Sequence, residues 1–177
     1  MRHRPSRPAL VLLLVLLGGC AADRSKGLSE SLDPWAEFSV RASLARPVEV
    51  ATVHVGDLRY AGADGSEKWL RKTTTFFGGG SRVQWTDTRS CPAAGEVLSR
   101  MYDLEMPRPI EGGIIEAQAD GLIYELSADA EFTGGRRARL SVGASGGTPL
   151  ANWMDRSLAE LEPCWSDLPP AEISTRR

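Results

Sequence analysis

The stretch "LIYELSADAEFTGGRRARLSVGAS" (122–145) alternates apolar and polar residues on both sides of a glycine pair. Such alternation is typical of two half-buried antiparallel strands joined by a tight turn. The apolar residues of the two strands share one face only if the loop has an odd number of residues. We therefore expect a loop at 134–136, which places Glu131 opposite Arg139 as an exposed ion pair.

Two other stretches carry related patterns. Residues 36–44 alternate in the same way, with apolar side chains at the even positions and polar ones between them. The stretch "FFGGGSRVQW" (76–85) predicts a second hairpin, because its three glycines supply the backbone freedom that a tight turn needs. Most of the chain is therefore expected to form an antiparallel sheet.

Two segments predict helices that follow these strands. "CPAAGEVLSRMYDLEM" (91–106) has a proline in its first turn and apolar residues at helical spacing. "TPLANWMDRSLAELEPCW" (148–165) begins with Thr148 as a candidate N-cap and Pro149 at the first helical position, and Pro163 ends it. We interpret the apolar stripe of each segment as core packing against the sheet.

The chain also contains an internal similarity. "VHVGDLRYAGADG" (53–65) matches "PIEGGIIEAQADG" (109–121) at a constant offset, and both are followed by a strand, a glycine-rich turn and a helix. This predicts a tandem strand-strand-strand-helix unit with one extra strand in front. The alternative is two ordinary Asp-Gly hairpins whose turns converged on the same residues. Either way, the expected fold is α+β, a single domain with a largely antiparallel sheet of about seven strands and two antiparallel helices on one face.

The N-terminus has the parts of an export signal. Residues 1–8 carry three arginines and no acid, and an apolar run from Ala9 to Leu17 follows. The apolar stretch ends at Ala22 and is shorter than the roughly 18 residues that indicate a transmembrane helix. Leu17-Gly18-Gly19-Cys20 resembles the lipobox of bacterial lipoprotein precursors.

That resemblance implies cleavage before Cys20 and acylation of both its thiol and the new amino group. Several acyl chains provide stable anchoring where one chain is marginal. Because Ala21 and Ala22 lack the aspartate that favours inner-membrane retention in enterobacterial lipoproteins, the inner leaflet of the outer membrane, facing the periplasm, is the expected location. The alternative is an ordinary cleaved signal in which Cys20 is incidental.

These features divide the chain into four parts. They are a signal peptide at 1–19, a lipidated cysteine with a flexible tether at 20–34, an α+β domain at 35–165 and a loose tail at 166–177. Without 1–19 the chain carries 18 basic and 23 acidic residues, because the signal contains three arginines and no acid. Since it lacks a basic stripe, nucleic acid is not an expected partner.

Two cysteines remain after the anchor, Cys91 and Cys164. An even pair in an exported protein indicates one disulfide. Two free buried thiols are the alternative. A metal site is not expected, because His54 is the only histidine after the signal and no Cys-x-x-Cys spacing exists.

Candidate catalytic residues are few. His54 could act as a general base beside Asp57, but no nucleophile is marked for it, and a lone histidine in a strand is more often structural. Acidic pairs are also present in the sequence, namely Asp87 with Asp103 or Glu105, and Asp129 with Glu131. The glycines at 78–80 join two strands and are not followed by Lys-Ser/Thr, so a phosphate loop is not indicated.

Five tryptophans are many for this length, and Trp69 or Trp85 on an open sheet could bind a ligand or partner. The function expected from these features is a non-enzymatic binding or interaction module on the lipid-anchored envelope protein, with no cofactor. One alternative is a small-molecule or lipid binder that uses a cavity in the sheet. The other is a periplasmic inhibitor of an envelope enzyme.

Overall fold

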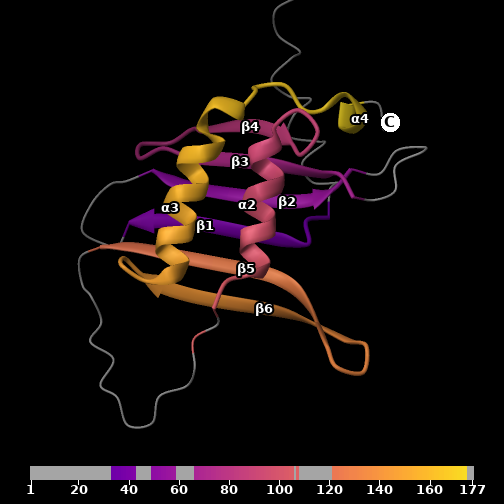
Figure 1. Ribbon diagram of the computed structural model, residues 1–177. Helices are drawn as coiled ribbons and strands as arrows, with labels where there is room; N and C mark the ends of the chain where they lie inside the picture. Colours follow the sequence, from indigo (N-terminus) through magenta and orange to yellow (C-terminus); the bar gives the residue numbers. More distant parts are fainter. Residues whose placement is uncertain (1–32, 43–48, 59–65, 106, 108–120, 175–177) are drawn as a thin grey trace, which may run out of the picture. The chain divides into compact units, whose positions relative to one another are not determined.

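Six strands form one antiparallel sheet in the part of the chain that the structure describes, in the order β4-β3-β2-β1-β5-β6 (Figure 1). The structure is a computed structural model, and it describes residues 33–42, 49–58, 66–105, 107 and 121–174. The compact unit that contains the sheet begins at Asp33. The strands are β1 (Ala36–Ala42), β2 (Val50–Asp57), β3 (Lys68–Thr75), β4 (Ser81–Asp87), β5 (Leu122–Phe132) and β6 (Arg136–Ser145).

Helices α2 (Pro92–Tyr102) and α3 (Pro149–Leu161) lie side by side on one face of this sheet (Figure 1). The α+β class and the two helices on one face are therefore confirmed. The Thr148 hydroxyl caps α3 by accepting a hydrogen bond of 3.2 Å from the backbone N–H of Ala151. Pro163 follows the end of α3, within the short 3-10 helix η1 (Glu162–Cys164).

The core lies between the helices and the sheet, where the apolar stripes meet. The sheet contributes alternate residues of its strands and the helices contribute one face each, because the period of each element aligns its apolar side chains. The fully buried members of this core include Ala36, Phe38, Val53, Val55, Leu70, Ala94, Val97, Met154 and Leu161.

The expected seventh strand is not found among the described residues. It was predicted from the second copy of the internal similarity, and residues 109–120 of that copy lie outside the described residues. The described elements nevertheless repeat the order strand, strand, helix, as β3-β4-α2 and again as β5-β6-α3. These two units lie on opposite sides of the central pair β1 and β2.

The turn of the β5–β6 hairpin differs from the expected one. Phe132 pairs with Arg136, so the loop is 133–135 instead of 134–136, and the register is shifted by two residues. Both loops contain Gly134 and Gly135, whose φ values are +102° and +77°, but the observed loop ends at Gly135, so Arg136 avoids a positive φ and stays in the strand. The expected Glu131–Arg139 pair is therefore wrong.

The shift by two residues keeps every side chain on its expected face, because side chains alternate with a period of two. Arg139 Nη1 lies 3.0 Å from Asp129 Oδ1, and Arg137 Nε lies 3.7 Å from Glu131 Oε2. Strand β5 therefore forms two exposed ion pairs with β6, where one pair was expected.

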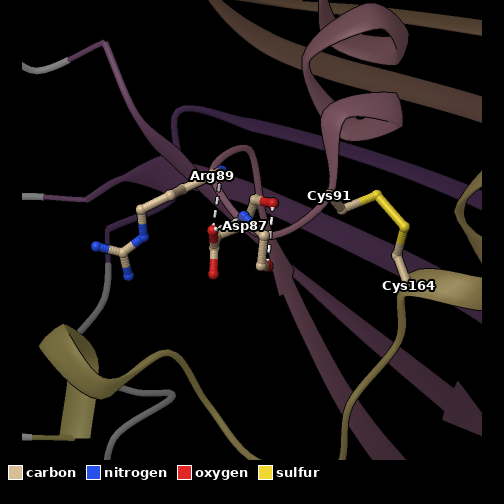
Figure 2. The surroundings of a disulfide bond; sticks show 5 residues. Asp87, Arg89, Cys91 and Cys164 are labelled. Atoms are coloured by element: carbon tan, nitrogen blue, oxygen red, sulfur yellow. Dashed lines mark hydrogen bonds between the residues drawn. A yellow bond between two sulfur atoms is a disulfide. The ribbon is translucent and has the colours of Figure 1, made fainter.

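The structure joins Cys91 to Cys164, with their Cα atoms 5.9 Å apart (Figure 2). Cys91 is the N-cap residue of α2, and Cys164 ends η1 directly after α3. The bridge therefore ties the start of one helix to the end of the other, which requires the two helices to run antiparallel.

The first residues of 166–174 bind the sheet, which differs from the loose tail expected at 166–177. The backbone of Ser166 exchanges two hydrogen bonds, of 2.7 and 2.9 Å, with that of Trp85 in edge strand β4. Arg82 and Asp167 form an ion pair at 3.0 Å, and Ile173, in the single turn α4 (Ala171–Ser174), is buried. The first part of the segment supplies the backbone partner that an edge strand lacks.

Candidate functional site

The face of the sheet opposite the helices is the main candidate surface for function. Register places Glu37 of β1 beside His54 of β2, and His54 beside Arg71 of β3. These residues alternate with the buried core residues, so their side chains lie on the helix-free face. Three ionisable groups from three strands, separate in the sequence, thus form one row.

His54 occupies the centre of this row. Its Nδ1 atom lies 3.3 Å from Glu37 Oε2, and its side chain is 19% exposed while that of Glu37 is 40% exposed. Burial lowers the pKa of His54, and the positive charge of Arg71 lowers it further, against the opposing effect of Glu37. The imidazole is therefore neutral at pH 7 and offers one nitrogen donor and one nitrogen acceptor.

Arg71 extends the row toward the edge of the sheet. Its guanidinium carbon lies 5.9 Å from the centroid of the Trp85 ring, which is within the range of a cation–π contact. Trp85 is the cross-strand partner of Arg71 in β4. The aromatic ring therefore holds a positive charge beside His54.

The other end of the row carries hydroxyl groups. Ser127 of β5 pairs with Glu37, and its Oγ atom lies 2.8 Å from Ser141 Oγ of β6. Neighbouring strands lie about 4.8 Å apart, so Ser127 stands two strands, or about 10 Å, from His54. Because the Glu37 carboxylate lies between them, this row does not bring the Ser127 hydroxyl within reach of the His54 imidazole.

Trp69 and Trp85 are not surface anchors, which corrects the binding role expected for them. They are 2% and 1% exposed, and their ring centroids lie 5.9 Å apart. A Cβ atom on Gly56 would stand 2.2 Å from the Trp69 ring, so this indole lies directly on the glycine backbone. The sequence left open whether these tryptophans are exposed, and it did not reveal that they pack against each other and that Trp69 packs against Gly56.

The expected acidic pairs have structural roles. Asp87 is buried before the start of α2, and Asp103 follows its last residue. The eleven residues of α2 lie between them, and a helix of that length is about 17 Å long. Figure 2 shows the Asp87 carboxylate in the turn before α2, where Oδ1 accepts hydrogen bonds from the backbone N–H groups of Arg89 (2.9 Å) and Ser90 (2.7 Å). Glu105 is exposed.

Asp129 and Glu131 both lie on the helix-free face, and each carboxylate forms an ion pair with an arginine of the neighbouring strand β6. The side chain of Asp129 is 61% exposed and that of Glu131 is 60% exposed. This arrangement is a solvated surface ladder and does not have the buried, unequal environments that tune two carboxylates for acid and base roles.

Lys72 is a polar residue whose role was not predicted. It shares a face with Leu70, so the alternation of β3 already placed it toward the helices. Its side chain is 10% exposed, its Nζ lies 3.0 Å from Glu162 Oε2, and it stands 4.8 Å from the Trp165 ring centroid. The lysine therefore holds the segment around Cys164 against the sheet.

No group of three or more His, Cys, Asp or Glu side chains lies close enough to hold a metal ion in the described ranges. No helix in the part that the structure describes is long and apolar enough to cross a membrane.

Comparison with known proteins adds no relative: no family model, no curated protein and no solved structure matches this chain. The site must therefore be interpreted from its own geometry. The Glu37–His54–Arg71 row offers a carboxylate, an imidazole and a guanidinium in fixed positions on a rigid sheet, which is a pattern suited to polar recognition.

Proposed function

We propose that this chain is a lipid-anchored, periplasm-facing envelope lipoprotein that acts as a non-enzymatic binding module. Its partner would be an envelope component that binds the helix-free face of the sheet. The observation that carries this proposal is the polar row Glu37–His54–Arg71, which lies on the face that the two helices leave open.

The layered architecture supports a binding role for this face. The core between the helices and the sheet fixes the strand positions, because buried residues such as Phe38 and Val53 alternate with the row residues. Groups placed on a rigid scaffold lose little conformational entropy on binding. The mixed charges of the row favour a partner that is itself polar, with both an anionic and a cationic group at the contact.

The anchor is supported by the N-terminal sequence alone. The lipobox-like run Leu17-Gly18-Gly19-Cys20 follows a basic segment and a short apolar segment. Acylation of Cys20 would hold the domain at the periplasmic side of the outer membrane. Two measurements test this step, namely the mass of the N-terminal peptide and the release of a Cys20→Ser variant from the membrane fraction.

Site-specific photocrosslinking in intact cells tests the binding face. A photoreactive residue is placed at Glu125, exposed on the helix-free face, and in a matched variant at Asn152, exposed on α3. We expect a defined crosslinked product from the Glu125 position and none from the Asn152 position. A product from the Asn152 position alone, or from neither position, would contradict the proposed face.

We also infer that the two strand-strand-helix units form a tandem repeat, with a further strand of the second unit in 109–120. The matched positions support it, because Leu70 and Leu126 both face the helices, and Val97 of α2 corresponds to Met154 of α3. Neither unit can bury its apolar face alone. Separate expression of each half should therefore give an unfolded product by circular dichroism, and a cooperatively folded half would contradict the shared core.

A further inference from the structure

The β5–β6 hairpin carries an apolar surface that the helices do not cover. Figure 1 shows its turn extending beyond α2 and α3. Phe132 is 62% exposed and Leu140 is 40% exposed, and both belong to the set of side chains that faces the helices farther along the strands. Ala130 pairs with Ala138 between them, so this stripe of the hairpin is continuous and apolar.

Basic side chains surround the same turn. Arg136 is the direct cross-strand partner of Phe132, and Arg137 follows on the opposite face. Both are exposed, and the Arg137 side chain is 84% exposed. An exposed aromatic ring flanked by arginines is a combination that suits an anionic lipid surface, because the ring enters the interface while the charges meet the phosphates.

The hairpin lies beside Pro34 and Trp35, the residues through which the chain enters the sheet from the N-terminus. The backbone N–H of Asp129 donates a 2.8 Å hydrogen bond to the carbonyl of Trp35, and Arg139 Nη1 lies 3.5 Å from the carbonyl of Pro34. Phe132 is only three residues beyond Asp129. The exposed turn therefore lies at the end of the sheet where the chain enters from the N-terminus.

An aromatic pair also lies at this end. The Tyr102 ring, at the last residue of α2, stacks on Trp35 with ring centroids 6.2 Å apart, and Tyr102 is 72% exposed. Tyrosine is enriched at membrane interfaces, where its ring is apolar and its hydroxyl remains hydrated. The aromatic side chains and arginines thus gather at one end of the sheet.

We propose that the β5–β6 turn, centred on Phe132 and Arg136, docks on the anionic surface of the bilayer that holds the lipid anchor. This inference rests on the proposed acylation of Cys20. Asp33 follows Cys20 by thirteen residues, and a chain of that length spans at most about 45 Å. The tether keeps the turn within reach of the bilayer, and the high effective concentration favours even a weak contact.

Docking in this orientation would turn the opposite end of the sheet away from the membrane. The β3–β4 turn lies at that end, because β3 and β4 meet there while β1 begins at the other. Phe77 of that turn is 78% exposed, which makes it a matched control: an exposed phenylalanine at a hairpin tip, but distant from the chain entry.

Quenching by nitroxide-labelled lipids tests the orientation. The acylated full-length mature protein is reconstituted in vesicles of phosphatidylethanolamine and phosphatidylglycerol, as a Phe132→Trp variant and a Phe77→Trp variant. The five native tryptophans contribute the same background to both. We expect lipid nitroxides to quench the added fluorescence of Phe132→Trp and to leave that of Phe77→Trp unchanged.

The charge requirement is tested on the same vesicles. Combining Phe132→Trp with Arg136→Gln and Arg137→Gln should lower the ratio of docked to undocked protein by about fivefold per arginine. The loss should vanish in vesicles that contain phosphatidylcholine alone. A loss of equal size on the uncharged vesicles would contradict the anionic-lipid part of the proposal.

The anchor and the docking surface can fail separately. If mass spectrometry shows no acyl group on Cys20, the proposed function fails at the anchor, and the docking proposal, which rests on that anchor, is overturned with it. If Cys20 is acylated but Phe132→Trp is not quenched, or Phe77→Trp is quenched equally, the anchor stands and the docking proposal is wrong. If the fluorescence of Phe132→Trp changes only when envelope protein is added, the turn binds a protein partner. That result would also overturn the docking proposal.

Discussion

Gly56 leaves no room for a side chain on the helix-free face. A Cβ atom there would stand 2.2 Å from Cζ2 of Trp69, so Gly56→Ala must displace the buried indole. Overpacking of this kind typically costs about 1–3 kcal/mol. We expect Gly56→Ala to lower the urea midpoint of unfolding accordingly.

Gly95 provides the matched control for that substitution. It lies within α2, and a Cβ atom there meets nothing within 4 Å. Because alanine favours a helix interior by up to about 1 kcal/mol over glycine, Gly95→Ala should leave stability unchanged or raise it. Equal midpoints for Gly56→Ala and the wild type would mean that Trp69 does not pack on the glycine.

His54 should give the folded protein a pH-dependent stability. Burial and the charge of Arg71 lower its pKa in the folded state, so the unfolded chain binds a proton at a higher pH. This contribution to stability is complete above the unfolded pKa of about 6.5 and is lost as the pH falls through the lower folded value. Urea unfolding at pH 7.5 and at pH 5.0 should show the decrease.

The His54→Gln variant isolates this effect, because glutamine cannot titrate and His54 is the only histidine after residue 19. The variant should lose less stability than the wild type between pH 7.5 and pH 5.0. If both proteins lose the same amount, the decrease comes from other groups and the environment of His54 does not disfavour its protonated form.

At the scale of single elements, the β5–β6 hairpin offers a test of register. The structure pairs Arg139 with Asp129 at 3.0 Å, whereas the alternation of the sequence predicted Glu131 as its partner. Exposed ion pairs of this kind contribute about 0.2–1 kcal/mol. A double-mutant cycle with Asp129→Ala and Arg139→Ala should give a coupling energy in that range, and the cycle with Glu131→Ala should give about zero.

The same hairpin shows what alternation can and cannot predict. Loops at 133–135 and 134–136 differ by a register shift of two, and both keep Ala130 and Ala138 on the core side. The pattern therefore predicted both strands and the buried face correctly. Both loops contain Gly134 and Gly135, and they differ in whether Thr133 or Arg136 completes the turn. The structure leaves Arg136 in the strand, so only glycines take positive φ in this loop.

Site prediction reached a similar limit. Trp69 and Trp85 were expected as binding residues on an open sheet, but both are buried, where their rings lie 5.9 Å apart and Trp69 packs on Gly56. The Glu37–His54–Arg71 row was not predicted either, although His54 was singled out. The partners of a strand residue depend on strand order, and the position of β1 between β2 and β5 follows from no local pattern.

At the scale of the whole molecule, the two faces of the sheet differ in what covers them. One face is covered by α2 and α3 and supplies the core, while the other keeps its ionisable row at the surface. An antiparallel sheet tolerates this asymmetry because its alternating side chains give each face its own chemistry. Substitutions on the helix-free face, apart from the tryptophan cluster, should therefore change binding more than stability.

The bridge between Cys91 and Cys164 acts on the whole molecule, because its partners are separated by 73 residues in the sequence. In the chain-entropy model a loop of that size stabilises the folded state by about 4 kcal/mol. That is a large fraction of the 5–15 kcal/mol by which most domains are stable. We expect the double variant Cys91→Ala, Cys164→Ala to lose this amount in urea unfolding, and a reductant to destabilise the wild type alone. Equal stability of variant and wild type, or alkylation of both thiols without reductant, would show that the folded protein does not depend on the bridge.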